Sequence, residues 1–172
     1  MSASAFDKAL DQLTRGVADL FASKRTLPGF ILLYTSMDIL ASMTRPENSE
    51  RTHSGFFKDW VTRYMLTPLA VPYSADDLWG ARCGLLHTLT AESDMSRSKG
   101  AKMLNYIGND AIAKAMQQKH DPTCSEDIFI STPQFVDAFL AACHGFAADV
   151  RSNASLQKRV TSHAAKLLVA ID

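Results

Sequence analysis

The sequence has few cysteines and no hydrophobic run of the length that a membrane span requires. Its three cysteines, Cys83, Cys124 and Cys143, are an odd and scattered set among 172 residues, which is typical of a reducing cytoplasm and unlike a disulfide framework. A transmembrane helix needs about 20 apolar residues in succession, and the N-terminal segment lacks the compact apolar stretch of a signal peptide. We therefore expect a cytoplasmic protein with no membrane partner.

The spacings that mark metal sites and hydrolase motifs are also missing. The five histidines show no paired ligand spacing, and neither C-x-x-C nor G-x-S-x-G occurs, so we expect no metal, no cofactor and no serine triad. Charge of one sign is lacking as well, because 18 basic residues balance 18 acidic ones. No overall positive field then draws the chain to nucleic acid, although a local basic patch is still allowed.

Helical periodicity is the dominant pattern in the sequence. Apolar residues recur at three- and four-residue steps through most of the chain, which predicts amphipathic helices. Ser74 has the position of an N-cap, with Asp76 and Asp77 in the first turn, and Pro133 suits a first helical position. Since 47% of the residues are apolar and the length suits one domain, we predict that residues 1–172 form one all-α bundle of about five to six helices. The expected helices cover residues 6–20, 30–43, 54–65, 74–89, 131–150 and 155–172.

The segment from residue 90 to residue 131 allows two interpretations. Met103–Ile107 and Asp127–Ile130 are short enough to be a pair of strands, which would form a short β-hairpin between residues 100 and 131. Asp110–His120 has the pattern of a helix, and the alternative is that the whole segment is helical.

The helix predicted over residues 74–89 places a charge where a core side chain is expected. At 100° per residue, Arg82 falls near the middle of an arc of leucine and tryptophan side chains. A guanidinium is almost never buried without a partner, so either an anionic group meets Arg82 or the arc faces an interface or a cleft. On the opposite side Gly80 and Gly84 each cost about 1 kcal/mol relative to alanine, which is tolerated where another backbone approaches closely. A helix with protein on both sides is what the centre of a homodimer would contain.

His87 follows Arg82 by five residues, which places the two side chains about 140° apart on an ideal helix. They would meet if His87 lay in a loosened last turn, or if a second copy of the helix supplied the complementary residue. The plain alternative is that Arg82 extends its charged end to water and that His87 is a structural residue with satisfied hydrogen bonds.

The hexapeptide from Arg82 to His87, RCGLLH, resembles the R-x4-6-H motif of the HEPN superfamily. The wider string from Ser74 to Thr88 is similar to uncharacterised bacterial proteins of that type, and Asp38 on the second predicted helix is compatible with them. The resemblance implies a helical bundle that dimerises and brings two motifs into a shared cleft. It also implies a metal-independent endoribonuclease of the kind found in toxin–antitoxin and phage-defence systems. Arg82 and His87 would be its catalytic residues, and an antitoxin protein would be a candidate partner.

An arginine and a histidine can perform that chemistry. Cleavage of RNA without a metal requires activation of the ribose 2′-OH and protonation of the leaving 5′-oxygen, and a histidine can do either near neutral pH. An arginine pairs with the phosphate oxygens. Residues 95–120 hold five basic residues against one acid, which would contact the backbone of an RNA strand. We assign substrate binding to Arg97, Lys99 and Lys102.

A function without catalysis is the main alternative. Active HEPN members often carry Asn, Asp or His directly after the arginine, and here that position is Cys83. Together with the neutral overall charge, this favours a dimeric helical module that binds RNA, a nucleotide or a partner protein through the same cleft.

Overall fold

The structure, a computed structural model, describes residues 4–46, 49, 53–68, 71–90, 93–98, 100–120 and 127–167. These residues are mainly helical, with two short strands, which confirms the prediction of a helical bundle. Of the helices described, none combines the length and the apolar character that a membrane crossing requires. In chain order the elements are α1 (Ala5–Ala22), α2 (Thr26–Ser42), α3 (Ser54–Val61), the π-helical turn η1 (Thr62–Leu66), α4 (Ala75–Thr88), α5 (Asp94–Arg97), β1 (Met103–Ile107), α6 (Asp110–Lys119), β2 (Asp127–Ser131), α7 (Thr132–Ser152) and α8 (Ala154–Ala164).

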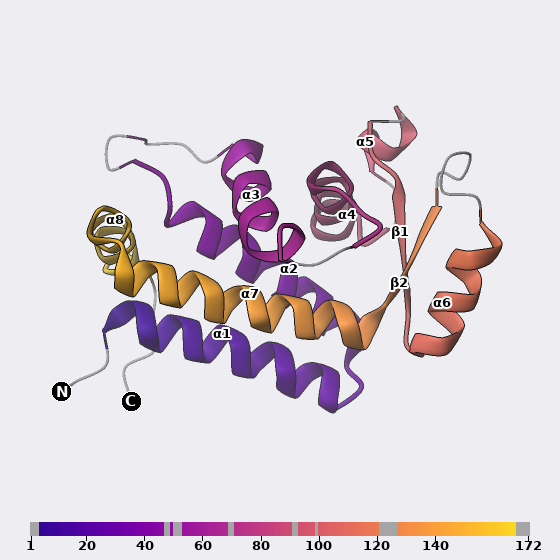
Figure 1. Cartoon of the computed structure of the whole chain (residues 1–172), viewed down its shortest axis with the longest axis horizontal. Helices are drawn as coiled ribbons and strands as arrows, with labels where there is room; N and C mark the ends of the chain where they lie inside the picture. Colours follow the sequence, from indigo (N-terminus) through magenta and orange to yellow (C-terminus); the bar gives the residue numbers. More distant parts are fainter. Residues whose placement is uncertain are drawn as a thin grey trace.

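The long helix α7 is the axis of the fold. Figure 1 shows α1 running beside it, α8 at one of its ends and the β1–α6–β2 unit at the other. The predicted apolar stripe of α7 is buried, since Phe135, Phe139 and Phe146 are at most 1% exposed. The rings of Trp60 and Tyr64, from α3 and η1, contact Phe146. The aromatic core therefore forms around α7.

The ends of the helices follow local capping as well as the apolar pattern. Ser74 caps α4 as predicted, because its hydroxyl accepts the Asp77 N–H at 3.2 Å while the Asp77 carboxylate accepts the Ser74 N–H at 2.8 Å. The helix expected after Pro28 begins earlier, at Thr26. A proline is tolerated in the first turn, where its missing N–H would have no partner within the helix. The last helix is described as α8 to Ala164, and residues 168–172 lie outside the described part of the chain.

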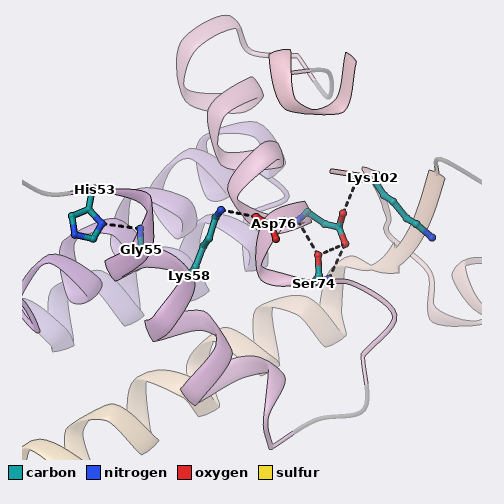
Figure 2. A network of polar contacts seen from close by, with 7 residues as sticks. His53, Gly55, Lys58, Ser74, Asp76 and Lys102 are labelled. Carbon is teal, nitrogen blue, oxygen red and sulfur yellow. Dashed lines mark hydrogen bonds and ion pairs between the residues drawn. The ribbon is translucent and has the colours of Figure 1, made fainter. Parts of the chain in front are cut away.

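The first turn of α3 has a cap that the sequence did not predict. The Gly55 N–H donates to the Nδ1 atom of His53 at 3.1 Å (Figure 2), so His53 is the N-cap of α3. An ion pair of 2.5 Å between Lys58 and Asp76 then joins α3 to α4. This ion pair links α3 to the first turn of α4.

The segment between residues 103 and 131 contains the predicted pair of strands, but not as a hairpin. β1 and β2 run parallel, with Met103 opposite Asp127 and Ile107 opposite Ser131. Parallel neighbours need a crossover connection instead of a tight turn, and α6 lies between them in the chain. The expected helix over Asp110–His120 is confirmed to within one residue. Since β2 leads directly into α7, this β-α-β unit is attached to the end of the axis helix.

A buried tyrosine hydroxyl and a buried thiol in the core predict that the protein loses stability in alkaline solution. Burial raises the pKa of Tyr73 from 10.0 to about 12, and that of the Cys143 thiol from 9.0 to about 12. A group whose pKa is raised on folding contributes its full stability below the unfolded pKa and loses it as the pH rises towards the folded value. We expect the free energy of unfolding, measured by urea denaturation, to start falling above about pH 9 and to keep falling towards pH 12.

The matched variant for this prediction is Tyr73→Phe. It keeps the ring against Phe135 and removes the ionising hydroxyl. Its free energy of unfolding should fall less steeply above pH 10 than that of the wild type. An identical slope in the two proteins would contradict the prediction.

Candidate functional site

Arg82 of α4 meets Asp38 of α2 where the two helices contact each other. The Arg82 Nε donates to the Asp38 Oδ2 atom at 2.6 Å, and the Nη2 atom lies 2.5 Å from the same oxygen. The two side chains are 20% and 26% exposed, so the pair is neither sealed in the core nor freely solvated. Of the alternatives that the position of Arg82 left open, an anionic partner is therefore the one that the chain itself supplies.

Burial and the neighbouring positive charge have opposite effects on the pKa of Asp38. Burial raises the pKa of the Asp38 carboxyl, while the hydrogen bond and the positive charge of Arg82 oppose the rise, as does the His87 ring. Asp38 is also the sole charged residue of α2, which is otherwise mostly apolar. If either partner were lost, the other would keep a partly buried charge without compensation, which is costly.

Arg82 also contacts His87 within the same chain. The Nη1 atom of Arg82 lies 3.2 Å from the Nε2 atom of His87. Because a guanidinium can only donate, Nε2 accepts, and the proton of the neutral imidazole is then on Nδ1. His87 lies in the last turn of α4, which ends at the C-cap Leu89 with left-handed backbone angles (φ 54°, ψ 32°). The contact thus forms without a second copy of the chain.

A cavity of about 310 Å³ opens beside this ion pair. Its wall combines the two charged side chains with aromatic rings, and α2, α3 and α4 all contribute to it. A volume of about 300 Å³ is at the small end of the range for ligand sites. The lining residues are Asp38, Ile39, Ala41, Ser42, His53, Phe56, Phe57, Trp79 and Arg82.

The wall of this cavity contains two stacked pairs of side chains. The Arg82 guanidinium lies over the Trp79 ring, with its central carbon 5.0 Å from the ring centroid. The His53 and Phe56 rings lie with centroids 4.3 Å apart and planes inclined by 31°. Since the Gly55 N–H occupies Nδ1 of His53, the proton of the neutral His53 ring is on Nε2. The cavity therefore offers aromatic faces together with hydrogen-bond donors and a carboxylate.

The residues assigned to substrate binding are only partly placed. Arg97 is the exposed last residue of α5, and Lys99 lies outside the described residues. The backbone N–H of Lys102 donates to the Asp77 Oδ1 atom at 2.5 Å (Figure 2). Asp77 precedes His87 by ten residues of α4, which is about 15 Å of helix. The structure therefore holds the backbone of Lys102 at the opposite end of α4 from His87.

Sequence reasoning gave no role to two residues of the cavity. Asp38 had a usable signal, because a lone carboxylate in an apolar helix needs a cation nearby. His53 had none, since it belonged to a set of histidines without ligand spacing and reaches the cavity only because α3 packs beside α4.

These residues offer an oriented cation, an imidazole and an aromatic cavity. Arg82 can meet a phosphate with the terminal N–H groups that Asp38 and His87 do not use. The His87 side chain is exposed, and an imidazole takes up and releases protons readily near neutral pH. In the described part of the chain, no three His, Cys, Asp or Glu side chains are grouped so that they could hold a metal ion. The arrangement suits phosphate recognition coupled to proton transfer.

Removing Asp38 should destabilise the protein through Arg82. In Asp38→Ala the guanidinium stays partly buried without its carboxylate, and we expect the free energy of unfolding to fall by about 1–3 kcal/mol. The double variant Asp38→Leu, Arg82→Leu removes both charges and should lie closer to the wild type. Urea denaturation of the three proteins measures both effects. A double variant less stable than Asp38→Ala would show that the ion pair does not control the stability of this helix contact.

Comparison with known proteins identifies no relative. No protein-family model matches the chain, and neither a curated protein nor a solved structure matches it.

Proposed function

We propose that the protein is a metal-independent endoribonuclease of HEPN type, with Arg82 and His87 as its catalytic residues. The observation that carries the proposal is the 3.2 Å contact between Arg82 Nη1 and His87 Nε2, beside a cavity that Arg82 lines. The two residues of the motif are adjacent in space although they lie about 140° apart on the helix. A cation beside a proton-transfer group is what cleavage of a phosphodiester by side chains requires.

The two residues divide the reaction between them. Arg82 pairs with the oxygens of the phosphate at the scissile bond, where negative charge grows in the transition state. His87 takes the proton from the 2′-OH or gives one to the leaving 5′-oxygen. The 2′-oxygen forms a bond to phosphorus as the bond to the 5′-oxygen breaks, so the product ends in a 2′,3′-cyclic phosphate. Asp38 acts through Arg82 and is a positioning residue.

The contact from Asp38 also bears on the departure at Cys83. Active HEPN proteins often orient the site with a polar residue directly after the arginine. In this chain a carboxylate from α2 bonds the Arg82 Nε at 2.6 Å. This contact supports a nuclease function in a chain that has no polar residue of that kind next to Arg82.

One observation favours binding without cleavage. Asp38 and His87 together contact all three nitrogens of the Arg82 guanidinium, so a phosphate has to share Arg82 with its partners in the chain. A helical module that binds RNA, a nucleotide or a partner protein through the same cavity needs Arg82 but needs no proton transfer by His87.

The deciding experiment is cleavage of a mixed-sequence RNA in EDTA by the wild type, His87→Gln and His87→Ala. We expect the wild type to cut and to leave 2′,3′-cyclic phosphate ends. Both variants should be slower by at least about 100-fold, because a general acid or base typically contributes about 10²–10⁴-fold to the rate. Analysis of the 3′ ends of the products measures the chemistry.

His144→Gln is the matched control for this experiment. His144 is an exposed histidine of α7 that does not line the cavity, and its variant should cut like the wild type. Cleavage that requires a divalent ion, or a His87→Gln variant as fast as the wild type, would contradict the nuclease. RNA binding by all the proteins with cleavage by none would select the binding module.

We also propose that the active form is a homodimer that meets at the C-terminal end of α4. Leu89 is 60% exposed, and its φ of 54° lies in the left-handed region. That conformation costs a residue with a side chain about 1–2 kcal/mol, and glycine is the usual residue there at the end of a helix. Contact with a second copy would bury this leucine and account for its presence two residues after His87.

Leu89→Gly and Leu89→Ala together distinguish the effect of the left-handed backbone from the effect of the leucine side chain. Leu89→Gly removes the side chain from the dimer contact and relieves the left-handed backbone, so we expect a monomer whose free energy of unfolding is about 1 kcal/mol higher than that of monomeric Leu89→Ala. Leu89→Ala should also dissociate the dimer, without the gain in stability. Light scattering at micromolar concentration measures the oligomeric state. A monomeric wild type would exclude the dimer, and the Arg82–His87 contact would remain because it lies within one chain.

A further inference from the structure

We propose that the cavity beside Arg82 is a subsite for one unstacked nucleobase of single-stranded RNA, with His53, Phe56 and Trp79 as its aromatic walls. The inference rests on the proposed nuclease function in taking RNA as the ligand. It adds a specific role for three residues that the R-x4-6-H motif does not contain.

The aromatic side chains that line the cavity are not fully buried. His53 is exposed, and Phe56 and Trp79 are half-buried, although all three line the same cavity. Aromatic side chains that are open to a cavity are the surfaces on which proteins stack the splayed bases of single-stranded RNA. The cavity, at about 310 Å³, is small for a ligand site and suits one base better than a longer stretch of strand.

The polar groups of the wall match the edge of a base. The Nε and Nη2 atoms of Arg82 both contact the Oδ2 atom of Asp38. Within the described part of the chain, no group donates to the other carboxylate oxygen of Asp38, Oδ1. A carboxylate oxygen accepts readily from the amino groups of bases. His53, which also lines the cavity, carries an Nε2–H that can donate to a base carbonyl or ring nitrogen, because the Gly55 N–H occupies its Nδ1.

The same hydrogen bond fixes the orientation of the His53 ring, because Nδ1 accepts the N-cap bond from Gly55. His53 therefore acts as a fixed donor and a stacking surface. Arg82 lines the cavity and contacts His87, so a base in the cavity would have its own phosphate close to the catalytic pair.

The test is binding of a fluorescent single-stranded RNA of about 12 nucleotides that is 2′-O-methylated throughout, so that it cannot be cleaved through a 2′-OH. Fluorescence anisotropy is measured with the full chain and with His53→Asn and Phe56→Leu. Asparagine is a good N-cap, so His53→Asn keeps α3 and removes the ring, and Phe56→Leu keeps an apolar side chain without the aromatic face. We expect each variant to bind about 5- to 100-fold more weakly, as for the loss of one base stack.

Three controls test whether the ligand is a base within a strand. A strand with the same backbone but with abasic sites throughout should bind the wild type more weakly and should not respond to His53→Asn. Phe21→Leu changes a half-buried ring of α1 that does not line the cavity, and it should bind like the wild type. Free 5′-mononucleotides at the same base concentration should compete poorly. Equal competition would mean that the ligand is a nucleotide and would overturn the assignment to a strand.

The outcomes separate this inference from the nuclease. Binding that depends on the bases and on His53 and Phe56, in a protein that cuts no RNA, would keep the subsite and reject the nuclease. Cleavage by the wild type that neither variant changes would keep the nuclease and overturn the subsite. Absence of binding, or equal affinity for the base-containing and abasic strands, would also overturn it.

Discussion

The ion pair between Arg82 and Asp38 is the interaction on which the candidate site depends. A guanidinium in a leucine-rich arc of a helix cannot stay there without an anion, and Asp38 supplies one from the neighbouring helix at 2.6 Å. The pair is only partly buried, so it meets a cavity as well as the core. One contact therefore joins α2 to α4 and also orients Arg82 beside the cavity.

The rest of the site is assembled around this pair by ordinary features of helices. Arg82 contacts His87 because His87 lies in the last turn of the same helix. His53 is held because it is the N-cap of α3, and the cap fixes which of its ring nitrogens carries the proton. Trp79 lies one turn before Arg82 and stacks under the guanidinium. Capping and helix periodicity thus determine the protonation and orientation of side chains that face the cavity.

Most of the fold was predictable because its cues are local. The apolar stripe of α7, the Ser74 cap of α4 and the two short strands all follow from residues close together in the chain. The expected hairpin was wrong because strand direction is not a local property. Two strands separated by a helix-forming segment can run parallel, and only their packing against neighbouring elements decides it. The N-cap of α3 was not predicted, because a histidine took the role usually filled by serine.

Local sequence patterns predict that the chain is helical, that Arg82 lies in an apolar arc where a core side chain is expected, and that Arg82 and His87 lie on one helix near its end. The tertiary structure alone decided that the anion is Asp38, that Arg82 and His87 meet within one chain, and that His53 and Phe56 line the cavity of Arg82. The physical reason is distance along the chain. Periodicity and capping act over three or four residues, whereas Asp38 and Arg82 are 44 residues apart and are brought together only by the packing of α2 against α4.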